Sequence, residues 1–227
     1  MPHAQKRRGV LLDVDGTLID SNDAHARSWV DAFVEFGYDV SFEQVRPLIG
    51  MGGDKLMAEL TGLDNEHGTG KEITERKKEL FEEHYLHTLK AFPGAHELLA
   101  RMRESGLRLV IATSAGKDEM NGLLEQAGLN ELIERRTSSD DAERSKPDPD
   151  IIKAALERGK LGASEALMIG DTPYDIGAAA RAGVGTIAFR CGGWWGDEDL
   201  SEAVAIYDGP AELVREFEES PLGRRSA

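Results

Sequence analysis

The sequence has a single cysteine, Cys191, and is poor in basic residues. With one thiol, no disulfide can form within the chain, which favours a reducing compartment. Lysine and arginine number 27 against 42 aspartate and glutamate residues, giving a formal net charge of −15. This deficit of positive charge argues against nucleic acid and anionic lipid as partners, because both require a basic surface.

Long hydrophobic runs are also absent. No segment approaches the length of about 18 apolar residues that a membrane span requires. Near the N-terminus, basic residues precede Val10–Leu12 as in a secretory signal, but Asp13 and Asp15 interrupt the apolar run. We therefore expect this segment to be the first strand of the fold and the protein to stay in the cytoplasm.

What the chain does contain is typical of a globular α/β protein. Hydrophobic residues make up 40% and charged residues 30% of its 227 residues, a length that allows one large domain or one domain with a lid. The patterns predict strands at Gly9–Val14, Leu107–Thr113, Arg135–Ser138, Ala166–Ile169 and Val184–Phe189. They predict intervening helices at His96–Ser105, Asp118–Ala127, Pro149–Arg158 and Tyr174–Ala182, and a last helix at Pro210–Glu219. Alternating strands and helices imply a parallel sheet.

Residues 20–88 break this alternation, because they show helix and loop patterns only. We expect helices at Ser21–Phe36, Ser41–Leu48, Lys55–Leu60 and Lys71–Lys90, with a glycine-rich loop at 49–53. The interruption comes directly after the first strand. The expected organisation is a core of residues 1–19 and 91–227 with an all-helical cap domain of residues 20–90 inserted over one edge of the sheet.

Polar side chains with chemical potential follow four predicted strands or lie in loops beside them. They are Asp13 and Asp15, Thr113 and Ser114, Lys146, and Asp171 with Asp175. Ligands of open α/β sheets bind outside the carboxyl ends of the strands. Each position also has a purely structural interpretation, since Asp-Gly is a turn signal and Thr, Ser or Asp caps helices. Together, in this order and at successive strand ends, they favour a functional site.

Several carboxylates in one crevice repel each other unless a cation compensates. Magnesium is the cation that suits an all-oxygen site and commonly meets a substrate phosphate there. A lysine and a hydroxyl suit phosphate oxygens. The residues therefore indicate metal-assisted phosphoryl chemistry with a carboxylate nucleophile.

The chain resembles the haloacid dehalogenase-like hydrolase superfamily. The resemblance rests on Asp13-Val-Asp15-Gly16-Thr17, then Ser114, then Lys146-Pro147, then Gly170-Asp171-Thr-Pro-Tyr-Asp175, and covers about residues 9–219. It implies a Rossmann-like parallel sheet with a helical cap inserted after the first motif. The similarity is greatest to the branch of phosphoglycolate phosphatases and beta-phosphoglucomutases.

The resemblance also implies a role for each motif residue. Asp13 would be the nucleophile that forms an aspartyl-phosphate, and Asp15 the general acid and then base. Ser114, or Thr113 beside it, would hold a phosphate oxygen, and Lys146 would neutralise charge on nucleophile and phosphate. Mg²⁺ would bind the carboxylates of Asp13 and Asp171 and the backbone carbonyl of Asp15. Asp175 would support Lys146 or the metal ligands, and Gly16 would permit the sharp turn out of the strand.

The branch of the superfamily is indicated by Asp15. The dehalogenase and phosphonate-cleaving branches typically lack an aspartate at that position, so Asp15 favours phosphate-ester chemistry. A mutase is the alternative to a phosphatase, since its relatives carry a histidine where this chain has His25. Those relatives also place lysine and arginine in the loop that here contains Gly52. Without that clamp for a second phosphate, unless Arg46 or Lys55 supplies it, we expect a phosphatase.

Other residues leave more than one interpretation. His25, Gly52, Arg46 and Lys55 are candidate cap contacts to substrate. His25 is equally compatible with a surface role, and residues such as Arg46 and Lys55 are more often surface charges than ligands. Trp194, Trp195 and Cys191 are expected to pack. A binding module that has lost turnover stays an alternative of a different class. The expected partner is a small phosphorylated metabolite of the phosphoglycolate or sugar phosphate type. Which phosphomonoester it is, and the oligomeric state, stay open.

Overall fold

The central feature of the molecule is a parallel β-sheet. In the computed structural model, which describes residues 7–223, its six strands follow the order β3-β2-β1-β4-β5-β6. The strands are β1 (Gly9–Leu12), β2 (Arg108–Ala112), β3 (Arg135–Thr137), β4 (Ala166–Gly170), β5 (Gly185–Phe189) and β6 (Ala205–Tyr207). All five strand pairs are parallel. This is the order of a doubly wound Rossmann-like sheet, so the predicted fold class is confirmed.

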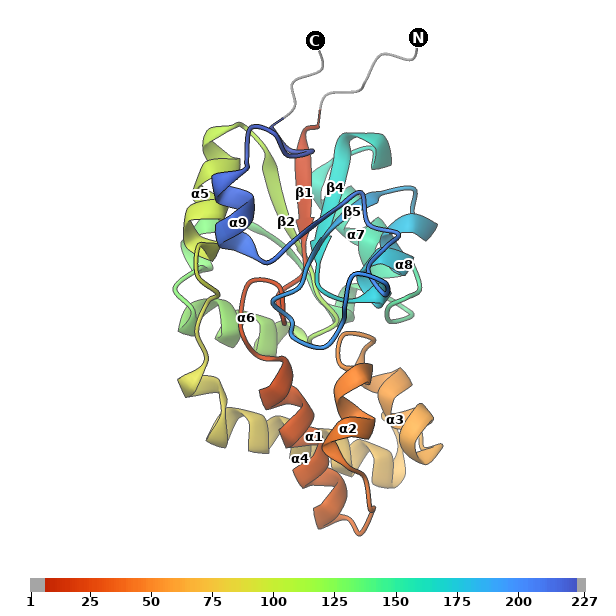
Figure 1. Ribbon diagram of the computed structural model, residues 1–227. Coiled ribbons are helices and arrows are strands. Elements are labelled where there is room, and N and C mark those ends of the chain that lie inside the picture. Colours follow the sequence, from red (N-terminus) through yellow and green to blue (C-terminus); the bar gives the residue numbers. More distant parts are fainter. Residues whose placement is uncertain (1–6, 224–227) are drawn as a thin grey trace.

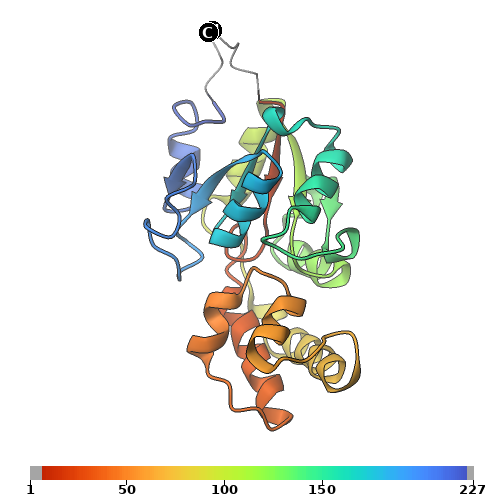
Figure 2. The ribbon, with the colours of Figure 1, turned by 90° about the vertical axis from the view of Figure 1, so that its right-hand side faces the viewer.

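Helices cover both faces of the sheet (Figures 1 and 2). Val10 and Leu12 of β1 pack with α5 (Ala95–Glu104), α6 (Lys117–Gln126) and α9 (Pro210–Arg215). Leu11 points to the opposite face and packs with α7 (Asp150–Gly159) and α8 (Pro173–Arg181). Successive side chains of a strand alternate between faces, so an uninterrupted apolar run is what a strand buried on both faces requires.

The remaining helices lie together beyond the carboxyl ends of the strands (Figures 1 and 2). They are α1 (Asn22–Glu35), α2 (Phe42–Val45), α3 (Gly53–Thr61) and α4 (Gly68–His84), and we call residues 20–90 the helical block. The block has a hydrophobic core of its own, which includes Trp29, Phe33, Met57 and Leu80. It contains no strand. No helix within residues 7–223 is long and apolar enough to cross a membrane.

Two adjacent segments connect the helical block to the sheet. The backbone N–H of Asp20 donates to the carbonyl of Lys90 at 3.1 Å, and that of Phe92 donates to Leu18 at 2.9 Å. The chain therefore leaves and re-enters the sheet at one place. The expected boundaries at 20 and 90 fall in these segments; of the expected core, residues 1–6 and 224–227 lie outside the described part.

One strand escaped prediction. The last predicted strand ended at Phe189, but β6 pairs with β5 at the edge of the sheet. It has three residues, of which only Tyr207 is buried. A segment this short carries no measurable periodicity, and its pairing depends on β5 being already in place.

Candidate active site

The strand order reverses between β1 and β4, and the first and fourth motifs follow these two strands. The backbone N–H of Asp13, just past β1, donates to the carbonyl of Ile169 in β4 at 3.0 Å. Asp171 comes directly after β4. A reversal of strand order opens a crevice at the carboxyl ends, which is where open α/β sheets bind ligands.

Asp13 and Asp175 share the ammonium group of Lys146. Lys146 Nζ donates to Asp13 Oδ1 at 2.6 Å and to Asp175 Oδ1 at 2.7 Å, and all three side chains are buried. Burial lowers the pKa of Lys146, but the two carboxylates outweigh it and raise the pKa. Lysine is therefore charged here, as a group that neutralises an anionic site must be.

Two carboxylates of this cluster hold protons more tightly than usual. Burial, followed by the charges of Asp175 and Asp171, raises the pKa of Asp13 well above its usual value, although Lys146 opposes the shift. Burial and Asp175 raise the pKa of Asp171 to about 7. One ammonium thus does not compensate the negative charge at this site.

Three buried carboxylates lie close enough to share a metal ion. One oxygen each from Asp13, Asp171 and Asp175 lies within 4.8 Å of the others. Asp171 accepts hydrogen bonds from Thr17 at 2.9 Å and Asn22 at 2.9 Å. Since the donors are oxygens and their charge is undercompensated, a hard divalent cation fits the group.

Gly16 makes the close approach of these segments possible. Its φ is +71°, and its N–H donates to the carbonyl of Ile19 at 2.9 Å to close the turn after β1. A Cβ atom there would collide with Asn22 and with the Asp171 carboxylate. Both the positive φ and the contact favour glycine, in agreement with the predicted turn.

Asp15 points to a different environment from Asp13. Its Oδ1 accepts a hydrogen bond from Ser21 Oγ at 2.6 Å and contacts His25 Nε2 at 2.8 Å. Ser21 precedes α1, but its hydroxyl is engaged with Asp15 and makes no cap bond to the helix. Burial raises the pKa of Asp15, but His25, Ser21 and Lys77 outweigh burial and hold it below its usual value.

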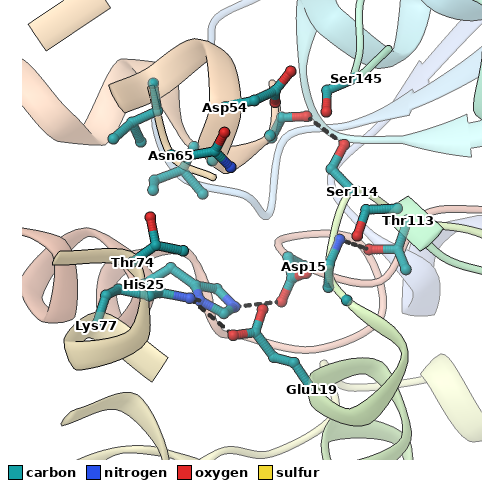
Figure 3. A pocket seen from close by; sticks show the side chains of 18 of the residues that line it. Asp15, His25, Asp54, Asn65, Thr74, Lys77, Thr113, Ser114, Glu119 and Ser145 are labelled. Atoms are coloured by element: carbon teal, nitrogen blue, oxygen red, sulfur yellow. Dashed lines mark hydrogen bonds and ion pairs between the residues drawn. The ribbon is translucent and has the colours of Figure 1, made fainter. Parts of the chain in front are cut away.

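His25 connects Asp15 to an ion pair that spans the helical block and the core (Figure 3). Lys77 Nζ of α4 lies 3.1 Å from His25 Nδ1 and donates to Glu119 Oε2 of α6 at 2.8 Å. An ammonium group only donates, so Nδ1 must accept and Nε2 must carry the proton that binds Asp15. The His25 ring also stacks on Phe81, with centroids 4.1 Å apart.

Thr113 and Ser114, between which the sequence left the register open, both line the pocket. Thr113 is buried, and its Oγ1 accepts from the N–H of Ala115 at 3.1 Å. Ser114 is half-buried and donates to the carbonyl of Gly50 in the helical block at 3.2 Å. The more accessible hydroxyl therefore belongs to Ser114.

A cavity of about 460 Å³ lies between the sheet and the helical block. Asp13, Asp15, His25 and Gly52 line it. Gly52 has a φ of +99°, and a Cβ atom there would come within 2.8 Å of an Asp54 oxygen.

The other two cap candidates lie elsewhere. Arg46 binds Asp23 at 2.7 Å and the carbonyl of Gly192, and Lys55 binds Asp148 at 2.6 Å. Neither is among the residues that line the cavity.

Four residues near the aspartates were not singled out from the sequence. Two of them could have been found from the sequence, because Thr17 lies inside the first motif and Lys77 is a charged residue between Ile73 and Phe81 on the apolar side of its helix. Asn22 and Glu119 have no sequence feature that points to the site. Asn22 meets Asp171 across 149 positions and Glu119 meets Lys77 across 42, so only tertiary packing reveals their roles.

Trp195 and Cys191 pack against neighbours, as expected, whereas Trp194 is 41% exposed. Trp194 lies under the guanidinium of Arg46, 5.8 Å from ring centroid to Cζ, and Trp195 packs edge-on against Tyr174. Burial raises the pKa of the Cys191 thiol, which donates to the carbonyl of Gly16 at 3.4 Å. A thiol with a raised pKa is a poor nucleophile.

Comparison with known families and proteins is consistent with this site. Residues 10–189 match the family described as haloacid dehalogenase-like hydrolase. The chain is 32% identical over 183 residues to a phosphoglycolate phosphatase of Nitrosospira multiformis, covering 78% of this chain and 80% of that protein. It is also 32% identical over 218 residues to SUPPRESSOR OF QUENCHING 1, a chloroplastic protein of Arabidopsis thaliana. That match covers 93% of this chain but spans only 20% of the length of the plant protein.

A solved structure gives the same result. A hydrolase from Pseudomonas syringae superposes with a TM-score of 0.87 at 28% identity, covering 94% of this chain and 99% of the other. Sheet and helical block are thus both present in that hydrolase.

Proposed function

The chain belongs to the haloacid dehalogenase-like hydrolase family, and from this premise we propose that it is a Mg²⁺-dependent phosphatase acting on a small phosphomonoester. The observation that carries the proposal is the pairing of Asp13 with Lys146 at the carboxyl end of β1, beside a separately held Asp15. One carboxylate can attack while the other transfers protons.

Asp13 is the proposed nucleophile. A carboxylate oxygen of Asp13 attacks phosphorus, the bond from phosphorus to the ester oxygen breaks, and an aspartyl-phosphate forms. Lys146 neutralises the charge that nucleophile and phosphoryl group bring together, and Ser114 offers a hydroxyl to a phosphoryl oxygen.

Asp15 is the proposed general acid and base. It gives a proton to the leaving oxygen in the first step and takes one from the water that attacks the aspartyl-phosphate in the second. The water oxygen bonds to phosphorus, the bond from phosphorus to Asp13 breaks, and inorganic phosphate leaves while the free Asp13 carboxylate is regenerated. His25 and Ser21 hold the Asp15 carboxylate in place throughout.

Mg²⁺ is the proposed cofactor, held by the carboxylates of Asp13 and Asp171 and the backbone carbonyl of Asp15. Both oxygens of Asp175 already bind Lys146 and Thr172, which favours a supporting role for Asp175. When bound, the cation would neutralise the phosphoryl oxygens and the excess of carboxylate charge. The helical block is the proposed cap, which excludes bulk water while the phosphoryl group passes to Asp13.

Phosphomutase activity is the alternative. It is disfavoured because the candidate cationic residues of the helical block do not line the cavity. A mutase binds a second phosphate, but Arg46 and Lys55 are engaged by Asp23 and Asp148 outside the cavity. The loop Ile49–Gly53 offers no cation. A catalytically silent module is disfavoured because every motif position carries a functional side chain.

The test is release of phosphate from 4-nitrophenyl phosphate and acetyl phosphate with and without Mg²⁺. Wild type should require Mg²⁺, Asp13→Asn should be inactive, and Asp39→Asn, a change on the exposed surface, should match wild type. Equal turnover by wild type and Asp13→Asn would refute the proposal that this chain is a phosphatase with Asp13 as its nucleophile. With beta-glucose 1-phosphate and its bisphosphate activator, glucose 6-phosphate forming faster than free phosphate would instead establish the mutase.

A further inference from the structure

The charged side chains that line the cavity are mostly acidic. Among the charged side chains that line the cavity, apart from Asp13 and Asp15, five are acidic and two are lysines. The acidic ones are Asp54, Glu66, Glu119, Asp140 and Glu143, and the lysines are Lys77 and Lys78.

Neither lysine is placed to bind a second anion deep in the cavity. Lys77 is buried and already donates to Glu119 and contacts His25. Lys78, the next residue of α4, is exposed to solvent, where an ion pair is screened and weak. Glu119 is paired with Lys77, and Glu66, Asp140 and Glu143 are exposed to solvent like Lys78. Within residues 7–223, Asp54 is therefore the half-buried charge of this lining that has no partner, and a carboxylate or second phosphate on the leaving group would meet that uncompensated charge.

The same lining offers hydrogen-bond acceptors. Asp54, in the first turn of α3, is half-buried, and its carboxylate makes no hydrogen bond or ion pair within residues 7–223. Asn65, in the loop between α3 and α4, is likewise half-buried, and both side chains point into the cavity (Figure 3). Thr74 Oγ1 donates to the carbonyl of Gly70 at 2.9 Å, so its lone pairs remain available. An ionised carboxylate accepts only, so Asp54 demands a donor from the ligand.

We propose that this cavity selects phosphomonoesters with an uncharged, polyhydroxylated leaving group, and that Asp54 is its specificity-determining residue. The proposal rests on the proposed phosphatase function and narrows it to sugar and polyol monophosphates. Hydroxyl groups of the leaving group donate to Asp54 and Asn65, whereas carboxylate-bearing esters and bisphosphates are rejected by charge.

The charge of Asp54 also has a structural interpretation, because an acidic residue in the first turn stabilises a helix. A matched control separates the two. Asp118 occupies the first turn of α6, is exposed and does not line the cavity. Asp118→Asn removes the same helix interaction without touching the proposed contact.

The experiment compares kcat/KM for sorbitol 6-phosphate and 6-phosphogluconate, two open-chain esters that differ in a hydroxymethyl group against a carboxylate at C1, with 4-nitrophenyl phosphate as reference. Wild type should prefer sorbitol 6-phosphate by about tenfold or more, the scale of a hydrogen bond to a charged group. Asp54→Asn should reduce that preference about threefold or more, through both a lower value for sorbitol 6-phosphate and a higher one for 6-phosphogluconate. Asp118→Asn should keep it.

The outcomes distinguish the two proposals. If no variant or wild type releases phosphate from 4-nitrophenyl phosphate with Mg²⁺, the phosphatase function itself fails. If that reference ester is hydrolysed but wild type prefers 6-phosphogluconate or shows no preference, the charge-based selection is wrong. If Asp54→Asn retains the full preference, or Asp118→Asn loses it equally, Asp54 is not the determinant.

Discussion

Asp13 and Asp15 lie two positions apart, yet the structure gives them opposite environments. Asp13 is buried among carboxylates with Lys146 as counter-charge, and its pKa is raised. His25, Ser21 and Lys77 hold the pKa of Asp15 below its usual value. Asp15 is therefore a carboxylate before substrate binds, and the negative phosphate must raise its pKa for it to act as an acid. Without a metal ion these shifts oppose the proposed roles, so a bound Mg²⁺ would have to lower the pKa of Asp13 for it to attack, while the substrate phosphate raises that of Asp15.

Asp15→Asn removes proton transfer while it keeps the shape of the side chain and the backbone carbonyl proposed for the metal. Turnover of alkyl phosphates should fall by about a hundredfold or more. The loss in the phosphoryl-transfer step should be smaller for 4-nitrophenyl phosphate, whose leaving group needs little protonation. Rapid-quench measurement of both esters checks this, with Mg²⁺ titrated by calorimetry. Retained alkyl-ester activity would remove Asp15 from its role.

Lys77→Met removes the charge behind His25 with little change of volume. Because Lys77 contributes to lowering the pKa of Asp15, the acidic limb of the pH–rate profile should move to higher pH. Leaving the partly buried Glu119 unpaired should also destabilise the fold, by up to about 3 kcal/mol. The double change Lys77→Met with Glu119→Gln should recover much of that stability but not the original pH profile. A pH–rate profile that is unshifted in the single and the double variant would show that the ion pair of Lys77 and Glu119 has a structural role only. Lys71→Met, a change on the same helix, is the control.

Single residues of this site differ in how far the sequence could predict them. Asp13 and Asp171 directly follow β1 and β4, and Lys146 lies in the loop between β3 and α7. Parallel strands bring their carboxyl ends to one edge, so the convergence of these residues could be expected. The partners of Asp15 come from α1, α4 and α6. Their meeting depends on how the helical block docks, which no local pattern encodes.

At the scale of elements, several polar contacts join the helical block to the core. Lys55 of α3 binds Asp148 and the carbonyl of Ser145, both in the loop that carries Lys146. Tyr174 of α8 donates to the carbonyl of Pro47 at 2.8 Å. These contacts lie on the rim of the cavity or beside it, so the conformation described here is one in which block and core are in contact.

Lys55→Met should loosen that contact without unfolding either part. The pair is partly exposed, with side-chain exposures of 30% and 26%, so its loss should cost less than about 1 kcal/mol of stability. KM should nevertheless rise a few-fold, since closure of the cap becomes less favourable. Arg144→Met is the matched control, because Arg144 contacts the same Asp148 from the core side. Equal KM values for wild type and Lys55→Met would show that the contact between Lys55 and Asp148 does not contribute to closure of the cap.

The elements themselves were largely predictable. Helices and strands with full periods, such as α1 and β4, appear within a few residues of expectation, since their apolar faces are long enough to show a pattern. Ser41 and Gln44 form a capping box at α2, a local signal. β6 was missed because its three residues at the edge of the sheet are too few to show a periodic pattern of apolar residues.

At the scale of the whole molecule, the net charge of −15 and the carboxylate cluster lead us to expect that cation binding contributes to stability. Folding brings Asp13, Asp171 and Asp175 together at a site with one ammonium. A divalent cation that binds the folded chain and not the unfolded chain raises the free energy of unfolding.

This stabilisation should depend on pH in a definite direction. The pKa of Asp171 is about 7 in the folded protein without metal and its ordinary value in the unfolded chain, and that of Asp13 is raised as well. Between those values the folded state holds protons that the unfolded state has lost, so these groups' contribution to stability falls as pH rises. Mg²⁺ requires the ionised carboxylates, and its own contribution should grow over the same range.

The increase in melting temperature on adding Mg²⁺ should therefore be larger at about pH 8 than at about pH 6. Asp171→Asn should lose most of the increase at both pH values, because it removes a proposed ligand and the group that titrates near 7. Asp118→Asn, which removes an equal charge from the exposed surface of α6, should respond as wild type does. A Mg²⁺ effect independent of pH, or one that survives in Asp171→Asn, would mean that the cation acts on the acidic surface at large and not at the carboxyl ends of β1 and β4.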